Sequence, residues 1–283
     1  MAAPGSRVVA VVLALLAANG LFAWLTFRGQ AGSVGPEAVA QAAERTSTSD
    51  GLRFSLLGEM ELPEVGSVSF TGSGAVDVQD QRGYASMDMS ALARQAGAPG
   101  ANQGDWTMEM VFDRRFVYMK FGLLGAMLGG KSWLGFDLER VSEALGIDSS
   151  LLRSQQQQGA DPASTLRFLK AVSDDVEEVG TEQVRGVEST HYRATVDLSS
   201  FPGVAELGGD DEMEMEVWVG RDNLIRRVKW SQSIKPQGTD QSVDASFTSE
   251  YFDFGTEVNV DPPSAHDVQD MTETVAAQLG AGR

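Results

Sequence analysis

The sequence contains no cysteine, and this absence removes several classes of protein. Without thiols the chain forms no disulfide bridge, no zinc site built on thiolates and no cysteine nucleophile. Cysteine-free chains occur on both sides of membranes, so the compartment has to be inferred from other features of the sequence.

Histidine is almost as scarce, with only His191 and His266 in the chain. Most of the C-terminal half separates them and no H-x-x-x-H spacing is present, so no metal ligands are predicted, and His191 is predicted to be structural. There is also no G-x-S-x-G element that would expose a nucleophilic serine. Adjacent carboxylates such as Asp174-Asp175 are typical of solvated turns and do not make an acid–base pair across a cleft. We therefore predict a protein that is not an enzyme and has no catalytic residues and no cofactor.

Basic residues are few compared with acidic ones. Lysine and arginine number 22 against 40 aspartates and glutamates, which gives a formal net charge of −18. A nucleic-acid-binding surface needs clustered lysine and arginine, so nucleic acid is excluded as a partner. With 283 residues, 42% of them hydrophobic, the chain is able to bury a substantial core.

Two short motifs resemble nucleotide-binding elements but stand in the wrong context. Gly125–Ser132 matches the phosphate-loop pattern G-x-x-x-x-G-K-[ST], in which backbone N–H groups and the lysine hold phosphates. Such a loop joins a buried parallel strand to a helix, whereas here it leads into Trp133-Leu134-Gly135-Phe136. A glycine-rich connection is the better interpretation. The kinase-like triplet Asp253–Gly255 lacks its companion motifs and is a coincidence.

The N-terminus contains one long uncharged run, Val8 to Phe27, between Arg7 and Arg28. A helix that spans a bilayer needs about 20 apolar residues, whereas the core of a signal peptide usually has about 7–15. We therefore expect an uncleaved membrane anchor, with the rest of the chain on the extracytoplasmic face of the cell membrane. The alternative is a signal that is cleaved near Gly29-Gln30-Ala31, followed by secretion.

The segment Glu212 to Trp230 has the pattern of a β-hairpin. Before the turn, methionines and valines alternate with glutamates, which is typical of a strand with one buried and one wet face. With Gly220–Asn223 as the loop, opposite charges face each other on the wet side. This register pairs Val219 with Leu224, Glu216 with Arg227, Met215 with Val228, Glu214 with Lys229, and Met213 with Trp230. Arg226 then falls on the apolar side, opposite Val217, where it needs a partner.

Alternation also predicts the remaining strands, and helical spacing predicts helices between and before them. The predicted strands are residues 52–62, 68–78, 83–90, 106–112, 115–121, 133–138, 176–184, 187–198 and 242–252, and the predicted helices are residues 36–45, 137–145 and 163–173. Glycines such as Gly72 and Gly74 stand on the apolar side of their strand, where a bulge or the close approach of a ligand would explain them. The order predicts an α+β fold with one large antiparallel sheet and helices on one face.

The candidate binding residues are apolar side chains on the strands that precede the helices and in the glycine-rich segment. Methionine adapts its shape to a ligand, although methionine stripes are also typical of ordinary core. The candidates are Phe54, Leu56, Phe70, Met87, Met89, Met108, Met110 and Phe112 on the strands, with Leu123, Leu124, Met127 and Leu128 as a lip.

Four stretches together resemble the mycobacterial LppX/LprG-type lipoproteins. They are Val179–Leu198, the Glu214–Val228 hairpin with its Trp218, Lys131–Leu138, and Val258–Pro263. The resemblance covers about residues 48–263 and implies a half-open antiparallel β-barrel, similar to the LolA and LolB carriers, with helices covering its concave face. It also implies an apolar cavity for acyl chains, and a role in binding and carrying lipids or lipoglycans in an actinobacterial-type cell envelope. The family's lipobox cysteine is absent, so an N-terminal helix or secretion has to replace the lipid anchor.

The chain then divides into an N-terminal membrane anchor or signal segment at residues 1–31, a linker or short helix at 32–50, a LppX/LolA-like lipid-binding domain at 51–263, and a C-terminal tail or short helix at 264–283. The expected partners are a lipid or glycolipid ligand, the membrane through the N-terminal helix, and an envelope protein. A membrane-anchored sensor or protein-interaction module on the same fold is the alternative function.

Overall fold

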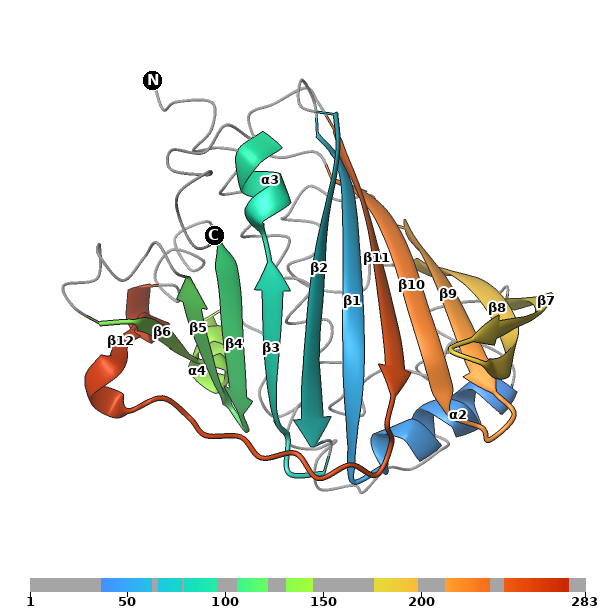
Figure 1. The fold of residues 1–283 in the computed structure, drawn as a ribbon, viewed down its shortest axis with the longest axis horizontal. Coiled ribbons are helices and arrows are strands. Elements are labelled where there is room, and N and C mark those ends of the chain that lie inside the picture. Colours follow the sequence, from blue (N-terminus) through green and yellow to red (C-terminus); the bar gives the residue numbers. More distant parts are fainter. Residues whose placement is uncertain are drawn as a thin grey trace.

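A computed structural model describes residues 37–62, 66–77, 79–95, 106–121, 131–144, 176–197, 212–234 and 242–274. The strands among them form one 12-stranded sheet, which is antiparallel except where β12 pairs with β6 (Figure 1). In chain order the strands are β1 Gly51–Leu62, β2 Gly66–Asp77, β3 Arg82–Asp88, β4 Thr107–Asp113, β5 Phe116–Phe121, β6 Trp133–Asp137, β7 Val176–Val184, β8 Val187–Asp197, β9 Glu212–Gly220, β10 Ile225–Ile234, β11 Val243–Phe252 and β12 Val268–Asp270. The prediction of one large antiparallel sheet is confirmed.

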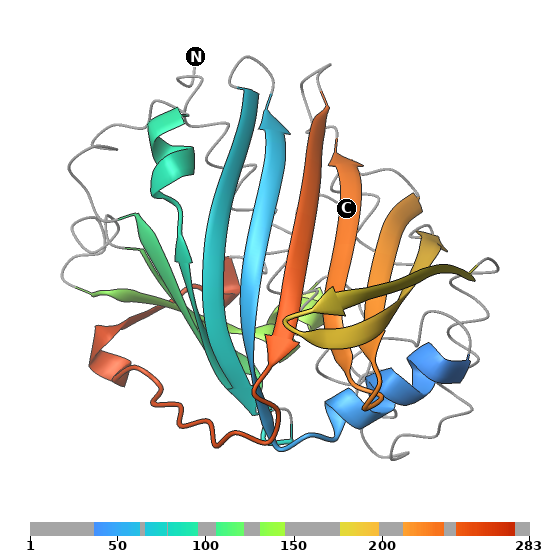
Figure 2. The same ribbon diagram turned by 45° about the vertical axis from the view of Figure 1, so that its right-hand side comes forward.

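The first and last long strands of the chain join its two halves. Across the sheet the strand order is β12-β6-β5-β4-β3-β2-β1-β11-β10-β9-β8-β7, so β1 lies between β2 and β11. Phe54 of β1, for example, stands opposite Gly74 of β2 on one side and Tyr251 of β11 on the other. The sheet is open, twisted and curved (Figure 2). The N-terminal and C-terminal strands therefore share one continuous face.

Three short helices, α2, α3 and α4, accompany the sheet (Figure 1). α2 (Glu37–Ser47) runs along the lower ends of β9 and β10 as drawn in Figure 1, with Val39 and Ala42 buried. α4 (Leu138–Ala144) follows β6 at the position that the helical spacing predicted. Val39 and Ala42 of α2 and Leu92 of α3 belong to the main buried cluster of the sheet, and Leu138 of α4 packs against it. The predicted helix at residues 163–173 lies outside the described part of the chain.

α3 (Ser90–Gln95) was not predicted, because the alternation of β3 continues to Met89 and hides the start of the helix. The carboxylate of Asp88 accepts a hydrogen bond from the backbone N–H of Ser90 (2.9 Å), as side chains at helix starts commonly do. A hydrogen bond from the Ser90 hydroxyl, together with this backbone bond, lowers the pKa of Asp88 below its ordinary value. A local hydrogen bond therefore ends the strand and begins the helix.

The β9–β10 hairpin is confirmed, but the predicted register is wrong by two residues. The observed partners are Ile225 opposite Val219, Arg227 opposite Trp218, Val228 opposite Val217, Lys229 opposite Glu216, Trp230 opposite Met215, and Ser231 opposite Glu214. One extra residue, Arg226, forms a bulge between Ile225 and Arg227. Because side chains alternate with a period of two, the shift of two beyond the bulge leaves the residues from Arg227 to Ser231 on their predicted faces. Ile225, which is shifted by only one residue, lies opposite Val219 and packs against the apolar cluster instead of on the predicted wet side.

The segment after β11 closes the far edge of the sheet. It runs along the lower end of the sheet (Figure 1), where a guanidinium nitrogen of Arg82 donates to the carbonyl of Val260 (3.1 Å). It then adds β12 beside β6, and the buried hydroxyl of Thr272 accepts a hydrogen bond from the N–H of Asp137 (3.0 Å). The region predicted as a tail or short helix thus begins with a 3-10 turn, Ala265–Asp267, and an edge strand.

Within the described residues, no helix combines the length and the apolarity that crossing a bilayer requires. The Val8–Phe27 run, for which we predict a membrane anchor, lies outside the described residues and stays a prediction.

Candidate functional site

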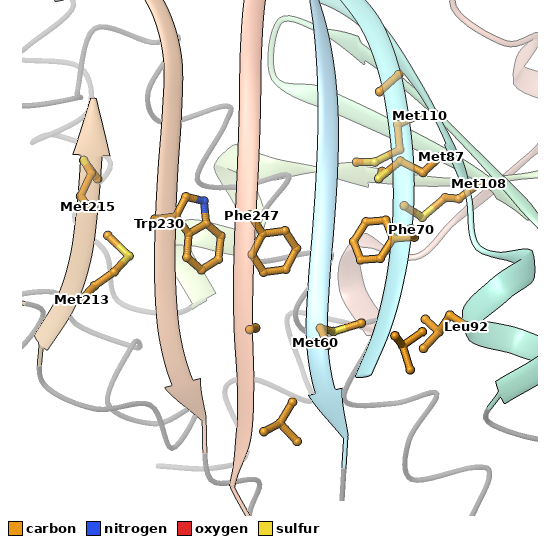
Figure 3. Packing of buried hydrophobic residues seen from close by; sticks show 14 of the residues in the cluster. Met60, Phe70, Met87, Leu92, Met108, Met110, Met213, Met215, Trp230 and Phe247 are labelled. Atoms are coloured by element: carbon orange, nitrogen blue, oxygen red, sulfur yellow. The ribbon is translucent and has the colours of Figure 1, made fainter. Parts of the chain in front are cut away.

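One face of the sheet is apolar across strands from both halves of the chain, and we call it the apolar face. Its residues belong to one buried cluster to which β1–β5 and β8–β11 all contribute. The buried methionine, phenylalanine and tryptophan side chains of this face are Met60, Phe70, Met87, Met89, Met108, Met110, Met213, Met215, Trp230 and Phe247. Figure 3 shows most of them gathered in one layer on this side of the strands. Eight of the 11 methionines of the chain lie in or against this cluster, since Met119 packs against it as well.

An aromatic ridge crosses the middle of the apolar face. Trp230 of β10 stacks on Phe247 of β11 with ring centroids 4.4 Å apart, and Phe247 meets Phe70 of β2 edge to face at 6.0 Å. β1 lies between β11 and β2, so Phe70 has to reach over it. It can do so because the facing residue of β1 is Gly58: a Cβ there would lie 2.3 Å from the Phe70 ring. Methionines lie on both sides of this ridge (Figure 3).

Neighbouring side chains occupy the space beside the glycines of β2. A Cβ on Gly74 would lie 2.6 Å from the Phe54 ring, and one on Gly72 would lie 2.7 Å from Met87. The β1–β2 register runs without a shift from Gly51–Asp77 to Leu62–Gly66, so the bulge considered as an explanation of these glycines is absent. Protein side chains occupy the space that the sequence left open for a ligand. The floor of the apolar face is therefore closely packed.

The structure brings eight of the twelve candidate residues together. Phe70, Met87, Met89, Met108 and Met110 are buried in the cluster, and Phe54, Leu56 and Phe112 pack against it. The lip candidates Leu123, Leu124, Met127 and Leu128 lie outside the described residues.

The candidate set missed the second half of the same face. Met213, Met215, Trp230 and Phe247 lie on β9, β10 and β11, and Met60 lies on β1 beside β11. Their alternation was visible in the sequence. What the sequence did not show was the pairing of β1 with β11, which makes these residues direct neighbours of the predicted ones.

The lower end of the apolar face is closed by a small second cluster around Leu52 and Tyr251. Burial raises the pKa of the Tyr251 hydroxyl to about 12, although a hydrogen bond with Ser249 opposes this shift. Arg226 lies at the same end, where it pairs with Asp222 and stands over the ring of Phe254 at 4.8 Å. The partner that the sequence required for Arg226 is thus present.

The opposite face of the C-terminal half carries a polar network around Trp218 of β9, which is only 4% exposed. His191 of β8 stacks on the indole with ring centroids 4.2 Å apart, and Arg227 of β10 lies over it at 5.0 Å. The turn of the β7–β8 hairpin reaches this face as well, because Arg185 bonds Glu250 of β11 (2.8 Å). His191 therefore has the structural surroundings that the sequence predicted.

Of the motif Gly125–Ser132, which matches the phosphate-loop pattern, the structure describes only Lys131 and Ser132, and both contact the C-terminal segment. The ammonium of Lys131 donates to the carbonyl of Val268 (2.9 Å), and the N–H of Ser132 donates to the carbonyl of Asp267 (3.0 Å). Both groups that would hold a phosphate thus hold the C-terminal segment. Among the described residues, no group of three or more histidine, aspartate or glutamate side chains is arranged to bind a metal ion.

No protein-family model matches the chain. Two Streptomyces proteins are similar in sequence. An uncharacterized 31.2 kDa protein from Streptomyces griseus is 29% identical over 235 residues, which covers 74% of this chain and 72% of that protein. SCO4650 from Streptomyces coelicolor, which is named as a lipoprotein, is 25% identical over 246 residues, or 87% of this chain and 69% of that protein.

Three solved structures are similar in fold. LppX from Mycobacterium tuberculosis gives a TM-score of 0.48 at 13% identity, over 79% of this chain and 96% of LppX. LprF from Mycobacterium bovis gives 0.39 at 13% identity, over 82% and 100%. The LolA superfamily protein NE2245 from Nitrosomonas europaea gives 0.29 at 8% identity, over 80% and 93%. The sequence predicted a resemblance to the LppX/LprG-type lipoproteins and the LolA-like carriers, and this resemblance is confirmed.

Proposed function

We propose that this chain binds the acyl chains of a lipid or lipoglycan on its apolar face and carries them, without catalysis, on the outer side of an actinobacterial-type cell membrane. The observation that carries the proposal is the continuity of the apolar face over strands from both halves of the chain. The relative that is named as a lipoprotein supports a place in the envelope.

The chemistry of the apolar face suits a flexible hydrocarbon ligand. Each methylene group moved from water to an apolar site contributes about 0.8 kcal/mol, so an acyl chain gains most of its affinity from contact area alone. Methionine side chains adapt to such a ligand because they are unbranched and polarizable.

The direct test is to purify the full-length chain in a mild detergent, extract it with organic solvent and identify the extract by mass spectrometry. A lipid at about one molecule per chain is the expected result. An extract without lipid, together with a protein that co-purifies tightly, would instead favour the alternative of a sensor or interaction module.

Tryptophan substitutions on the apolar face test whether the lipid binds there. Met110→Trp or Met89→Trp is expected to leave the fold intact in at least one case and to remove the lipid from the extract, because the larger side chain occupies the ligand's space. In a packed core the same change costs about 1–3 kcal/mol by overpacking. Leu57→Trp is the matched control, since Leu57 lies on the opposite face of β1 and is 38% exposed. If both methionine variants unfold and the wild-type extract holds no lipid, the apolar face is ordinary core.

A further inference from the structure

One indole group on the apolar face has no hydrogen-bond partner. Trp106 stands directly before β4, and its carbonyl accepts a hydrogen bond from the N–H of Met89 (3.1 Å), which extends the β3–β4 ladder. Because side chains alternate along a strand, Trp106 lies on the same side as Met108, which is 0% exposed. The indole packs against the buried cluster of the apolar face.

The Nε1 atom of Trp106 is shielded from solvent and meets no acceptor among the described residues. Buried donors in native proteins are nearly always paired, so an unpaired one calls for an explanation. Among the described residues, no other buried, unpaired polar side-chain atom lies in or against the cluster of the apolar face. Trp230, which also lies on this face, is not one of these unpaired groups.

We propose that Trp106 Nε1 donates a hydrogen bond to the ester carbonyl oxygen of a bound acyl lipid. The apolar face would then take ester-linked acyl lipids in preference to ether-linked lipids with the same chains. This proposal rests on the lipid-binding function proposed above and specifies the chemical class of the ligand.

An uncharged acceptor fits the surroundings of Trp106 better than a phosphate or a free carboxylate. The cluster against which the indole packs consists of apolar side chains such as Met87, Met89 and Met108. Burying a charged group among them without a cation is costly, whereas a carbonyl group loses little on leaving water if it gains a hydrogen bond. Arg226 does not serve as that cation, because it lies at the lower end and pairs with Asp222.

The test compares two neutral lipids that differ only in the ester carbonyl groups, dioleoylglycerol and its dioleyl ether counterpart. The full-length chain in non-ionic detergent is incubated with each lipid, excess lipid is removed, and the retained lipid is measured by mass spectrometry. We expect the wild type to bind the ester about fivefold more tightly than the ether, which is the effect of one neutral hydrogen bond. Trp106→Phe keeps the ring but removes the donor, and is expected to bring the ratio to about one without weakening ether binding.

Trp230→Phe is the matched control, because it removes an indole from the same face without removing an unpaired donor. It is expected to weaken both lipids alike and to leave the fivefold ratio unchanged. Equal binding of both lipids by the wild type, or a preference that survives in Trp106→Phe, overturns the role of Trp106 while lipid binding stands. Retention of neither lipid by the wild type overturns the proposed function itself.

Discussion

Gly58 shapes the apolar face by having no side chain. The ring of Phe70 lies where a Cβ of residue 58 would be, with the nearest ring atom 2.3 Å from that position. Phe70 thereby reaches Phe247 on the other side of β1, and the aromatic ridge becomes continuous. The need for glycine comes from a neighbouring aromatic side chain and not from an unusual backbone conformation.

Gly58→Ala should therefore displace Phe70 and destabilise the fold by about 1–3 kcal/mol through overpacking. Combining it with Phe70→Leu removes the clash, so the double variant should be more stable than the sum of the two single effects predicts. Urea unfolding of the wild type, both single variants and the double variant measures this coupling. Additive effects would show that residues 58 and 70 do not share the same space.

Glu216 is a largely buried carboxylate on the opposite face of the sheet. Its two oxygens lie 2.7 Å from His191 Nε2 and 3.3 Å from Lys229 Nζ, and its side chain is only 11% exposed. Burial on its own would raise the pKa of Glu216, but the hydrogen bonds and charges of Lys229 and His191 outweigh burial and lower it below 4.5. The ionised carboxylate is thus part of the folded structure.

A lowered pKa in the folded state means that Glu216 stabilises the fold above its ordinary value of 4.5, and that this contribution is lost as the pH falls through the folded pKa. Glu216→Gln is expected to lose about 1–3 kcal/mol at pH 7, because Lys229 and Arg193 lose a charged acceptor. The difference from the wild type should shrink when urea unfolding is repeated below pH 4.5. Glu214→Gln is the control, with a small effect at both pH values because Glu214 is 57% exposed. An equally large loss at both pH values for Glu216→Gln would exclude this electrostatic role.

At the scale of the element, the β9–β10 hairpin shows that alternation indicates the face on which a side chain lies but not the residue with which it pairs. The face of each β9 residue was predictable, because the buried side of β9 carries methionine and valine and the wet side carries glutamate at three of its four positions. The register was not, because a shift of two residues preserves the faces and still places Glu216 opposite a basic residue. In the predicted register Glu216 faces Arg227, and in the observed one it faces Lys229. The longer turn and the bulge at Arg226 decide between them, and neither has a sequence signal of its own.

The absence of cysteine allows the register to be tested by cross-linking. Glu214 and Ser231 face each other in the structure, so Glu214→Cys with Ser231→Cys should form a disulfide on mild oxidation, since facing Cα atoms fall within the range of about 4.4–6.8 Å that disulfides need. The pair Glu214→Cys with Lys229→Cys represents the predicted register and should not cross-link, because diagonal neighbours lie about 7–8 Å apart. Gel mobility before and after reduction reads out both. Efficient cross-linking of the second pair alone would restore the predicted register.

At the scale of the whole molecule, the strands and their faces were predictable while the assembly of the two halves was not. Local alternation located every long strand, and eight candidate residues share one face, as predicted. Alternation gives no information about which distant strands pair, so the β1–β11 junction and the contributions of Met213, Met215, Trp230 and Phe247 were missed. The edge strand β12 was missed for a similar reason: three residues are too few to show a period.

The last whole-molecule property is the attachment of the sheet to a membrane. The uncharged run Val8–Phe27 is as long as a bilayer-spanning helix, and α2 begins at Glu37. Even a fully extended chain from Arg28 to Pro36 reaches only about 30 Å, so an uncleaved anchor would hold the sheet close to the bilayer from which it takes or to which it delivers a lipid.

We therefore expect the protein to stay in the membrane fraction after washing at high pH, which strips peripheral proteins but not spanning helices. The measurement is immunoblotting of the washed membranes and the supernatant, with N-terminal sequencing of any soluble form. A variant that lacks residues 1–31 and carries a cleavable signal peptide is the control, and it should appear in the supernatant. A soluble wild-type chain that begins near Gly32 would instead show that the N-terminal segment is a cleaved signal and that any lipid is carried by a secreted protein.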